Sequence, residues 1–204
     1  MLLSHDVRLE IDRVFMDPMD WPPDDRRPLL YLLRRDLKDQ YGREEEPAES
    51  VQLKSPLLTC LGIMVGFELL AKLWSGKHEF RERDGKATVK EFMRSIVRVG
   101  EHEADALVDF RNSLAHSYGL SIGKGRSLSV DDDTGSACRE VSIADLGEGK
   151  SKIYVNVWHL KDLFVRAVRQ YRLQLGADCD LQKKFTVCLA NLGEIHITGS
   201  VKSR

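Results

Sequence analysis

The sequence lacks several features that mark common protein classes. Its four cysteines include no Cys-x-x-Cys pair, so neither a zinc ribbon nor a thioredoxin-type redox site is predicted. Neither charge is in excess, with 31 basic and 32 acidic side chains, which excludes a histone-like or polybasic protein. No Gly-x-Ser-x-Gly, His-Glu-x-x-His or complete phosphate-loop motif occurs. Any contact with nucleic acid must therefore come from a local patch of charge.

A long uncharged apolar run and an export signal are lacking as well. The most apolar stretch, residues 56–74, contains Cys60 as a small core residue and is interrupted by Glu68 and Lys72. Its uncharged part is shorter than the roughly 20 apolar residues that a membrane-spanning helix needs. The first residues have no basic region, and charged side chains break their apolar pattern. We expect a cytoplasmic protein that makes no membrane contact.

The chain does have enough apolar side chains for a core, with 42% hydrophobic residues over a length of 204. This length fits a single domain, residues 1–204. Periodicity predicts helices in the first half and strands in part of the second. The helices are expected at residues 2–15, 28–42, 55–74, 88–99, 101–118 and 159–175, and the strands at 126–130, 139–144 and 152–158.

These elements predict a mainly α protein of the α+β class. Its antiparallel helical bundle comprises residues of about 1–120 and 159–176. A small antiparallel β meander, at about 121–158, is inserted before the last long helix. The tail, 177–204, is expected to contain a strand at 194–201 that joins the meander.

The helix at 101–118 places a charge inside its own apolar stripe. At about 100° per residue, Arg111 falls near the middle of the face formed by Leu107, Val108, Phe110, Leu114 and Ala115. Asn112 and His116, four residues apart, stack on its flank. A buried arginine needs a partner. One interpretation is an ion pair with Glu68, because Glu68 and Lys72 are the only charges on the buried helix; the other is a site where an anion such as a phosphate binds the guanidinium.

The segment Arg111-Asn112-Ser113-Leu114-Ala115-His116 resembles the signature of HEPN (higher eukaryotes and prokaryotes nucleotide-binding) domains. That signature is an arginine, a polar residue, three variable residues and a histidine. Tyr118 extends it to the form of toxin-type HEPN proteins. Residues 68–72 resemble an acidic-x-x-x-basic element on another helix of these domains. The resemblance covers residues 26–120 and the helix at 159–175, so the fold it implies is a HEPN-like bundle. The meander and the last 27 residues depart from a minimal HEPN bundle.

The resemblance implies a metal-independent endoribonuclease that needs no cofactor and acts as a toxin or antiphage effector. RNA supplies its own nucleophile, the 2′-hydroxyl, and the products carry a 2′,3′-cyclic phosphate and a 5′-hydroxyl. His116, of a residue type with a pKa near about 6.5, would act as general acid or base. Arg111 would hold the scissile phosphate, and Asn112 would orient the substrate or His116. A homodimer joined through the motif helices would supply two histidines.

The resemblance also implies partners and leaves alternatives open. Tyr118 is either a target of AMPylation by a nucleotidyltransferase-type antitoxin or a tyrosine packed at a helix end. Five cations have two interpretations as well: they guide an RNA backbone, or they are merely solvated. These cations are Lys124, Arg126, Arg166, Arg169 and Arg172.

The second hypothesis is a non-catalytic HEPN-like dimerisation module that binds a nucleotide, RNA or a protein. The joint presence of Arg111, Asn112 and His116 favours the enzyme, whereas the long meander favours the module, because an inserted sheet can cap a cleft or build an interface. Catalysis requires Arg111 and His116 to line an accessible cleft. An Arg111 buried against Glu68 without a cavity would argue against catalysis.

Overall fold

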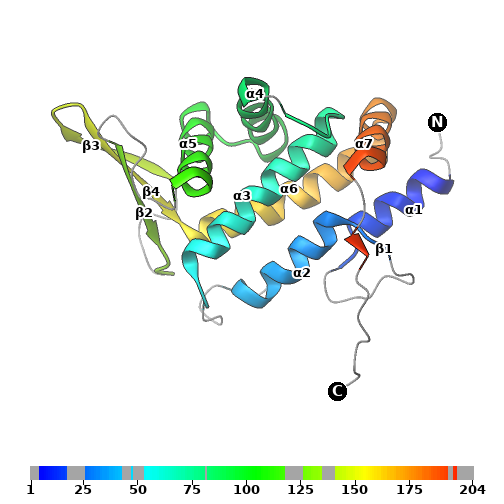
Figure 1. Cartoon of the computed structure of the whole chain (residues 1–204), viewed down its shortest axis with the longest axis horizontal. Helices are drawn as coiled ribbons and strands as arrows, with labels where there is room; N and C mark the ends of the chain where they lie inside the picture. Colours follow the sequence, from blue (N-terminus) through cyan, green and yellow to red (C-terminus); the bar gives the residue numbers. More distant parts are fainter. Residues whose placement is uncertain are drawn as a thin grey trace, which may run out of the picture.

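In a computed structural model, the chain folds into a bundle of helices with a small sheet at one end (Figure 1). The structure describes residues 5–17, 26–42, 47, 53–80, 82–117, 126–134, 141–192 and 195–196. Its helical elements are α1 (His5–Val14), α2 (Leu29–Tyr41), α3 (Pro56–Ser75), α4 (Glu82–Phe92), the π-helical turn η2 (Met93–Val97), α5 (Glu101–Ser117), α6 (Val157–Ala177) and α7 (Cys179–Leu192). The strands are β1 (Arg26–Arg27), β2 (Arg126–Asp131), β3 (Ser142–Gly147), β4 (Lys150–Asn156) and β5 (Ile195–His196). The predicted mainly α fold of the α+β class is confirmed.

Helix α3 lies at the centre of the bundle and contacts α2, α4, α5, α6 and α7. It is apolar on most sides, as an enclosed helix must be. Two glycines allow neighbouring helices to approach closely. A Cβ added to Gly62 would lie 2.8 Å from Cδ2 of Leu37 in α2, and one added to Gly66 would lie 2.5 Å from Cε2 of Phe164 in α6. The absence of these two side chains therefore sets how closely α2 and α6 pack on α3.

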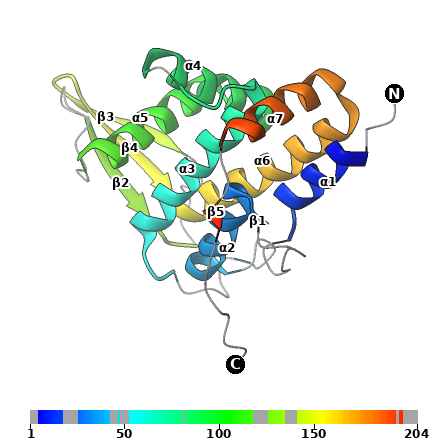
Figure 2. The same cartoon turned by 45° about the vertical axis from the view of Figure 1, so that its right-hand side comes forward.

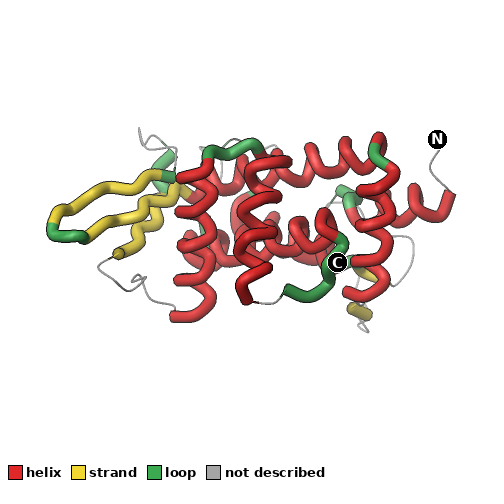
Figure 3. The backbone as a smooth tube through the Cα atoms, turned by 90° about the horizontal axis from the view of Figure 1, so that it is seen from above, coloured by secondary structure: helices red, strands yellow, loops and turns green. Residues whose placement is uncertain are grey.

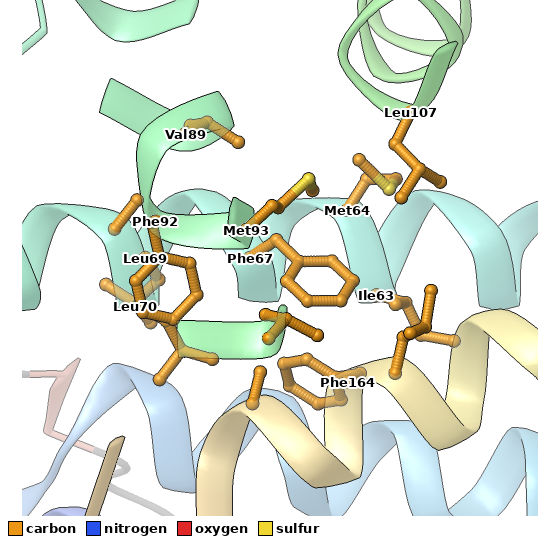
Figure 4. Packing of buried hydrophobic residues seen from close by; sticks show 14 of the residues in the cluster. Ile63, Met64, Phe67, Leu69, Leu70, Val89, Phe92, Met93, Leu107 and Phe164 are labelled. Carbon is orange, nitrogen blue, oxygen red and sulfur yellow. The ribbon is translucent and has the colours of Figure 1, made fainter. Parts of the chain in front are cut away.

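The core forms where α3, α6 and the η2 turn meet (Figure 4). The rings of Phe67 and Phe164 pack edge to face with centroids 5.6 Å apart, a favoured aromatic geometry. Phe92 and Met93 are fully buried beside them. Cys60 is also fully buried, as predicted, and burial raises the pKa of its thiol to about 12. This thiol stays protonated and behaves as a small apolar side chain.

Within the described residues, α3 is the one helix long and apolar enough to cross a membrane. More than half of its most apolar window is buried against other helices. A buried core helix passes the same test of length and composition, so α3 alone is weak evidence for a membrane span.

The three-stranded sheet projects from one end of the helical body, as seen from above in Figure 3. It is not the antiparallel meander that the sequence predicts. The strand order is β2-β4-β3, with β3 antiparallel to β4 but β2 parallel to β4. The turn between β3 and β4 has positive φ at Glu148 (52°) and Gly149 (69°), the conformation of a tight hairpin. The hairpin fixes β3 beside β4, and β2 takes the opposite edge of β4.

The C-terminal part also differs from the prediction. Residues 179–192 form helix α7, where no element was expected. Strand β5 does not join the three-stranded sheet but pairs with β1, with Arg26 opposite His196 (Figure 2). Helix α7 packs on α3 through its buried side chains, which are Leu181, Phe185 and Cys188. The helical bundle therefore extends beyond the predicted boundary at residue 176.

Candidate functional site

The central feature of the candidate site is a charged cluster that joins α3 to α5. Glu68 accepts a hydrogen bond from Nη2 of Arg111 through its Oε2 atom. Its other oxygen, Oε1, lies 3.4 Å from Nζ of Lys72, one turn further along α3. The ion pair predicted between Arg111 and Glu68 is therefore present. Glu68 is shared by two cations, so the cluster carries one net positive charge.

The cluster is only partly buried. The side chain of Arg111 is 31% exposed, that of Glu68 21% and that of Lys72 23%. Arg111 is thus partly exposed although it arises from an apolar helix face, as long cationic side chains commonly are. The ion pair fixes the orientation of the guanidinium without removing it from solvent. The geometry lies between the two alternatives posed by the sequence, a fully buried ion pair and an open anion site.

Asn112 adds a second contact to the same guanidinium. Its Oδ1 atom accepts a hydrogen bond of 3.1 Å from Nη1 of Arg111. Its amide nitrogen, Nδ2, is buried and has no hydrogen-bond partner among the described residues. Leaving a buried donor without a partner costs about 1–3 kcal/mol, so such a donor in a native structure needs an explanation, and a functional role is one of them. Asn112 thus orients Arg111 and holds an amide donor beside it.

His116 lies in the last turn of α5, one turn after Asn112 on the same flank. Its backbone is helical, and its side chain lies outside the described part of the structure. Tyr118 and Lys124 also fall outside the described residues, whereas Arg126 is the first residue of β2. The helix thus brings Arg111, Asn112 and His116 onto one continuous element, as the sequence predicts.

The three arginines on α6 do not form one uniform set. Arg166 and Arg169 are exposed on α6. Arg172 instead donates a hydrogen bond of 3.1 Å to Asp12 of α1 and is half exposed. It therefore ties α6 to α1 as well as carrying charge at the surface. All three are exposed to solvent, as a contact with RNA requires.

The structure also contains a pair that the sequence analysis did not identify. Nε2 of His159, in the first turn of α6, lies 2.9 Å from Oε1 of Glu103, in the first turn of α5. Both side chains are mostly buried, at 19% and 24% exposed. Their positions in the chain are 56 residues apart, so no local spacing connects them. The sequence does indicate where each of the two helices begins. The contact between His159 and Glu103, however, depends on how α5 crosses α6.

Within the described residues, no three side chains of histidine, cysteine, aspartate or glutamate gather closely enough to hold a metal ion. The chemistry that the cluster offers is that of hydrogen-bond donors and cations. Arg111 presents a planar fork suited to a carboxylate or a phosphate. Lys72 adds a point charge, and its ammonium also lies 5.5 Å from the centre of the Phe80 ring. Arg111 and Lys72 thus form a partly exposed cationic surface suited to an oxyanion, and Asn112 orients the guanidinium from behind.

Comparison with models of known protein families, with curated proteins and with solved structures finds no match.

Proposed function

We propose that this protein is a metal-independent endoribonuclease of the HEPN type. The observation that carries the proposal is the position of Arg111, which Glu68 and Asn112 hold at the surface although it arises from an apolar helix face. A fixed guanidinium in this position binds a phosphate in one orientation. The motif that continues from it, through Asn112 to His116, supplies the proton-transfer group that RNA cleavage needs.

In the proposed mechanism, Arg111 binds the scissile phosphate and stabilises the charge that develops on it. His116 accepts the proton of the 2′-hydroxyl, whose oxygen then attacks the phosphorus. The bond to the 5′-oxygen breaks, and this oxygen takes a proton from a second histidine. A homodimer related by two-fold symmetry supplies that second His116. The products are a 2′,3′-cyclic phosphate and a 5′-hydroxyl, and the reaction takes place in the cytoplasm.

A second candidate function is a non-catalytic module that dimerises and binds a nucleotide, RNA or a protein. It is favoured by the ion pair itself, because Glu68 occupies the guanidinium that a phosphate would need. In this case the cluster chiefly holds α3 against α5. A nucleotidyltransferase-type antitoxin that modifies Tyr118 belongs only to the enzymatic proposal.

The test compares the wild type with His116→Ala and Arg111→Gln on labelled single-stranded RNA and tRNA, in buffer containing a metal chelator. We expect the wild type to leave cyclic phosphate ends. His116→Ala should lower the rate by at least about 100-fold, the usual contribution of a general acid or base. The matched control is His78→Ala, which removes an exposed histidine outside the motif and should retain the full rate.

Two results would contradict the proposal. The first is cleavage at full rate by His116→Ala, which would show that another group transfers the proton or that the activity is a contaminant. The second is the absence of cleavage by a folded, dimeric wild type on either RNA. That second result, together with RNA binding that depends on Arg111, would favour the non-catalytic module.

A further inference from the structure

A surface hollow of about 460 Å³ opens where α4 passes through the η2 turn into α5. Its lining includes Arg94 and Arg98 together with Gly100 and Glu101, which lie at the start of α5. The other side of the η2 turn faces the core, where Phe92 and Met93 are buried (Figure 4). The wider turn therefore anchors its apolar side chains inward while it presents two arginines outward. The hollow lies at the opposite end of α5 from His116.

The acidic groups around the hollow contact side chains other than its two arginines. Glu101 lies 3.3 Å from Nζ of Lys90, and Asp105 lies 2.7 Å from the same ammonium. These two carboxylates raise the pKa of Lys90, Asp105 most strongly, through a hydrogen bond. Glu91 accepts a hydrogen bond of 2.9 Å from the hydroxyl of Ser95. None of these acids forms an ion pair with the arginines of the hollow.

Arg94 and Arg98 are both exposed, and neither side chain has an ion pair or hydrogen bond with any described residue. Both line the same hollow, where their like charges repel each other. An anion placed between them would remove that repulsion. The start of α5 adds to the attraction. The amide of Ala104 donates to the carbonyl of Gly100, and the amides of residues 101–103 have no acceptor within the helix, so they can donate to an anion.

The backbone of Arg98 has a conformation that is unusual for a residue other than glycine. Its φ of 62° and ψ of 36° are left-handed, a region that glycine adopts more readily. Arg98 therefore occupies a backbone position where glycine would be less strained.

We propose that this hollow binds the phosphate group of a nucleotide or of an RNA strand, held by Arg94 and Arg98. The two guanidiniums supply forked donors that match phosphate oxygens. The site does not rest on the ribonuclease proposal, because it lies at the other end of α5 and contains no residue of the motif. It would add a second phosphate contact to the protein whether or not the chain cleaves RNA.

The test is an NMR titration of the ¹⁵N-labelled full chain with inorganic phosphate, AMP and adenosine, at constant ionic strength in chloride. We expect saturable shifts of the amides from Arg98 to Glu101 with phosphate and with AMP, but not with adenosine. The double variant Arg94→Gln/Arg98→Gln should weaken phosphate binding by about tenfold or more, from the loss of two charge-assisted contacts. The matched control Arg8→Gln removes an exposed arginine on α1, far along the chain from the hollow, and should bind as the wild type does.

A separate variant, Arg98→Gly, distinguishes a loss of phosphate binding from a loss of folding. Glycine suits the left-handed backbone, so this variant should be at least as stable to urea as the wild type and yet bind phosphate more weakly. A short RNA without a terminal phosphate distinguishes the sources: equal shifts would identify a backbone phosphate, and their absence a terminal one. The proposal is overturned if phosphate produces no more shift than chloride, or if the double variant binds phosphate as tightly as the wild type.

Discussion

Glu68 has two opposing effects on the residues around it. It holds the guanidinium of Arg111 in one position, and it also cancels one of the two positive charges in the cluster. Position matters for catalysis, because a displacement of about 1 Å can cost roughly 100-fold in rate. Charge matters for the affinity of the protein for RNA. The two effects can therefore be separated in one variant.

We predict that Glu68→Gln lowers the KM for RNA by about threefold and lowers kcat by about tenfold. The KM falls because the net positive charge of the cluster rises. The size of this effect is that of a partly exposed ion pair. The kcat falls because the neutral amide no longer holds the guanidinium of Arg111 as firmly. Steady-state cleavage at two salt concentrations measures both parameters, and the gain in affinity should shrink at high salt.

The matched control for this variant is Glu10→Gln, which removes a carboxylate paired with Arg13 at 3.0 Å on α1. It makes the same change of charge away from the cluster and should alter neither parameter by more than about twofold. If Glu68→Gln leaves kcat unchanged, Glu68 does not position the arginine. If both variants lower KM equally, the effect is one of overall charge.

The pairing of Arg111 with Glu68 could be predicted because α3 offers so few alternatives. Its apolar sequence contains only Glu68 and Lys72 as charged residues, so a buried cation facing this helix had one carboxylate available. No such elimination was possible for His159 and Glu103, because the chain has many exposed acids that could face the start of α6. The number of candidate partners, rather than the distance along the chain, decided which contact could be predicted.

At the scale of elements, the contact between α3 and α6 depends on the small size of Gly66. A methyl group at this position would meet Cε2 and Cζ of Phe164 at 2.5 and 2.7 Å, and Cδ2 of Leu33 at 3.2 Å. The Phe164 ring is fully buried and packs on Phe67, so it has little room to move. The gain in helix propensity from alanine is thus outweighed by a steric conflict.

We predict that Gly66→Ala lowers the free energy of unfolding by about 1–3 kcal/mol. The matched control is Gly176→Ala in α6, where nothing lies within 4 Å of the added Cβ. It should raise the free energy of unfolding by about 0.5–1 kcal/mol, because alanine restricts the unfolded chain and favours helix. Urea unfolding followed by circular dichroism measures both. Equal effects in the two glycine variants would show that α3 and α6 are not packed closely at Gly66.

Sequence periodicity located most elements but not their pairing. Alternating side chains indicated the strands near 126–130 and 152–158, yet β2 and β4 are parallel. Alternation specifies which side chains share a face, such as Leu128 and Ile153, which are both buried. It does not specify strand direction. The direction of β2 depends here on contacts that residues near the end of β4 make with the segment just after β2. Asn156 and Trp158 donate hydrogen bonds to the carbonyls of Asp133 and Asp132.

Helix α7 escaped prediction because it has few apolar residues facing the bundle. Leu181, Phe185 and Cys188 are its buried side chains, and Lys183 and Lys184 interrupt the pattern. A local signal was nevertheless present in Asp178, whose Oδ1 accepts hydrogen bonds from the amides of Asp180 and Leu181. This is the arrangement of a helix N-cap, and an aspartate before a sparse apolar pattern would have indicated a helix here.

At the scale of the whole molecule, the surface beside the charged cluster contains exposed apolar side chains. Leu58 is 56% exposed and Val65 is 47% exposed. With Glu68 and Lys72 they recur at helical spacing along one face of α3. The apolar stripe is thus continuous with the cluster that contacts α5. An apolar centre with a charged rim is the usual composition of an interface between subunits, so we expect the proposed homodimer, joined through the motif helix α5, to bury this adjoining face of α3 as well.

We predict that the wild type is a dimer in solution, with twice the chain mass of 23.2 kDa, and that Leu58→Asp/Val65→Asp is a folded monomer. Aspartates at the centre of the interface would be buried without partners and would repel their symmetry mates across the two-fold axis. Sedimentation equilibrium measures the masses.

The matched control is Leu173→Asp on α6, which replaces a leucine that is 68% exposed and should remain dimeric. The monomeric variant should also lose RNA cleavage, because each proposed active site needs a second histidine from the partner. A wild type that is monomeric at about 100 μM, well above the micromolar Kd expected of a standard interface, and that still cleaves RNA would contradict both the interface and the two-histidine mechanism.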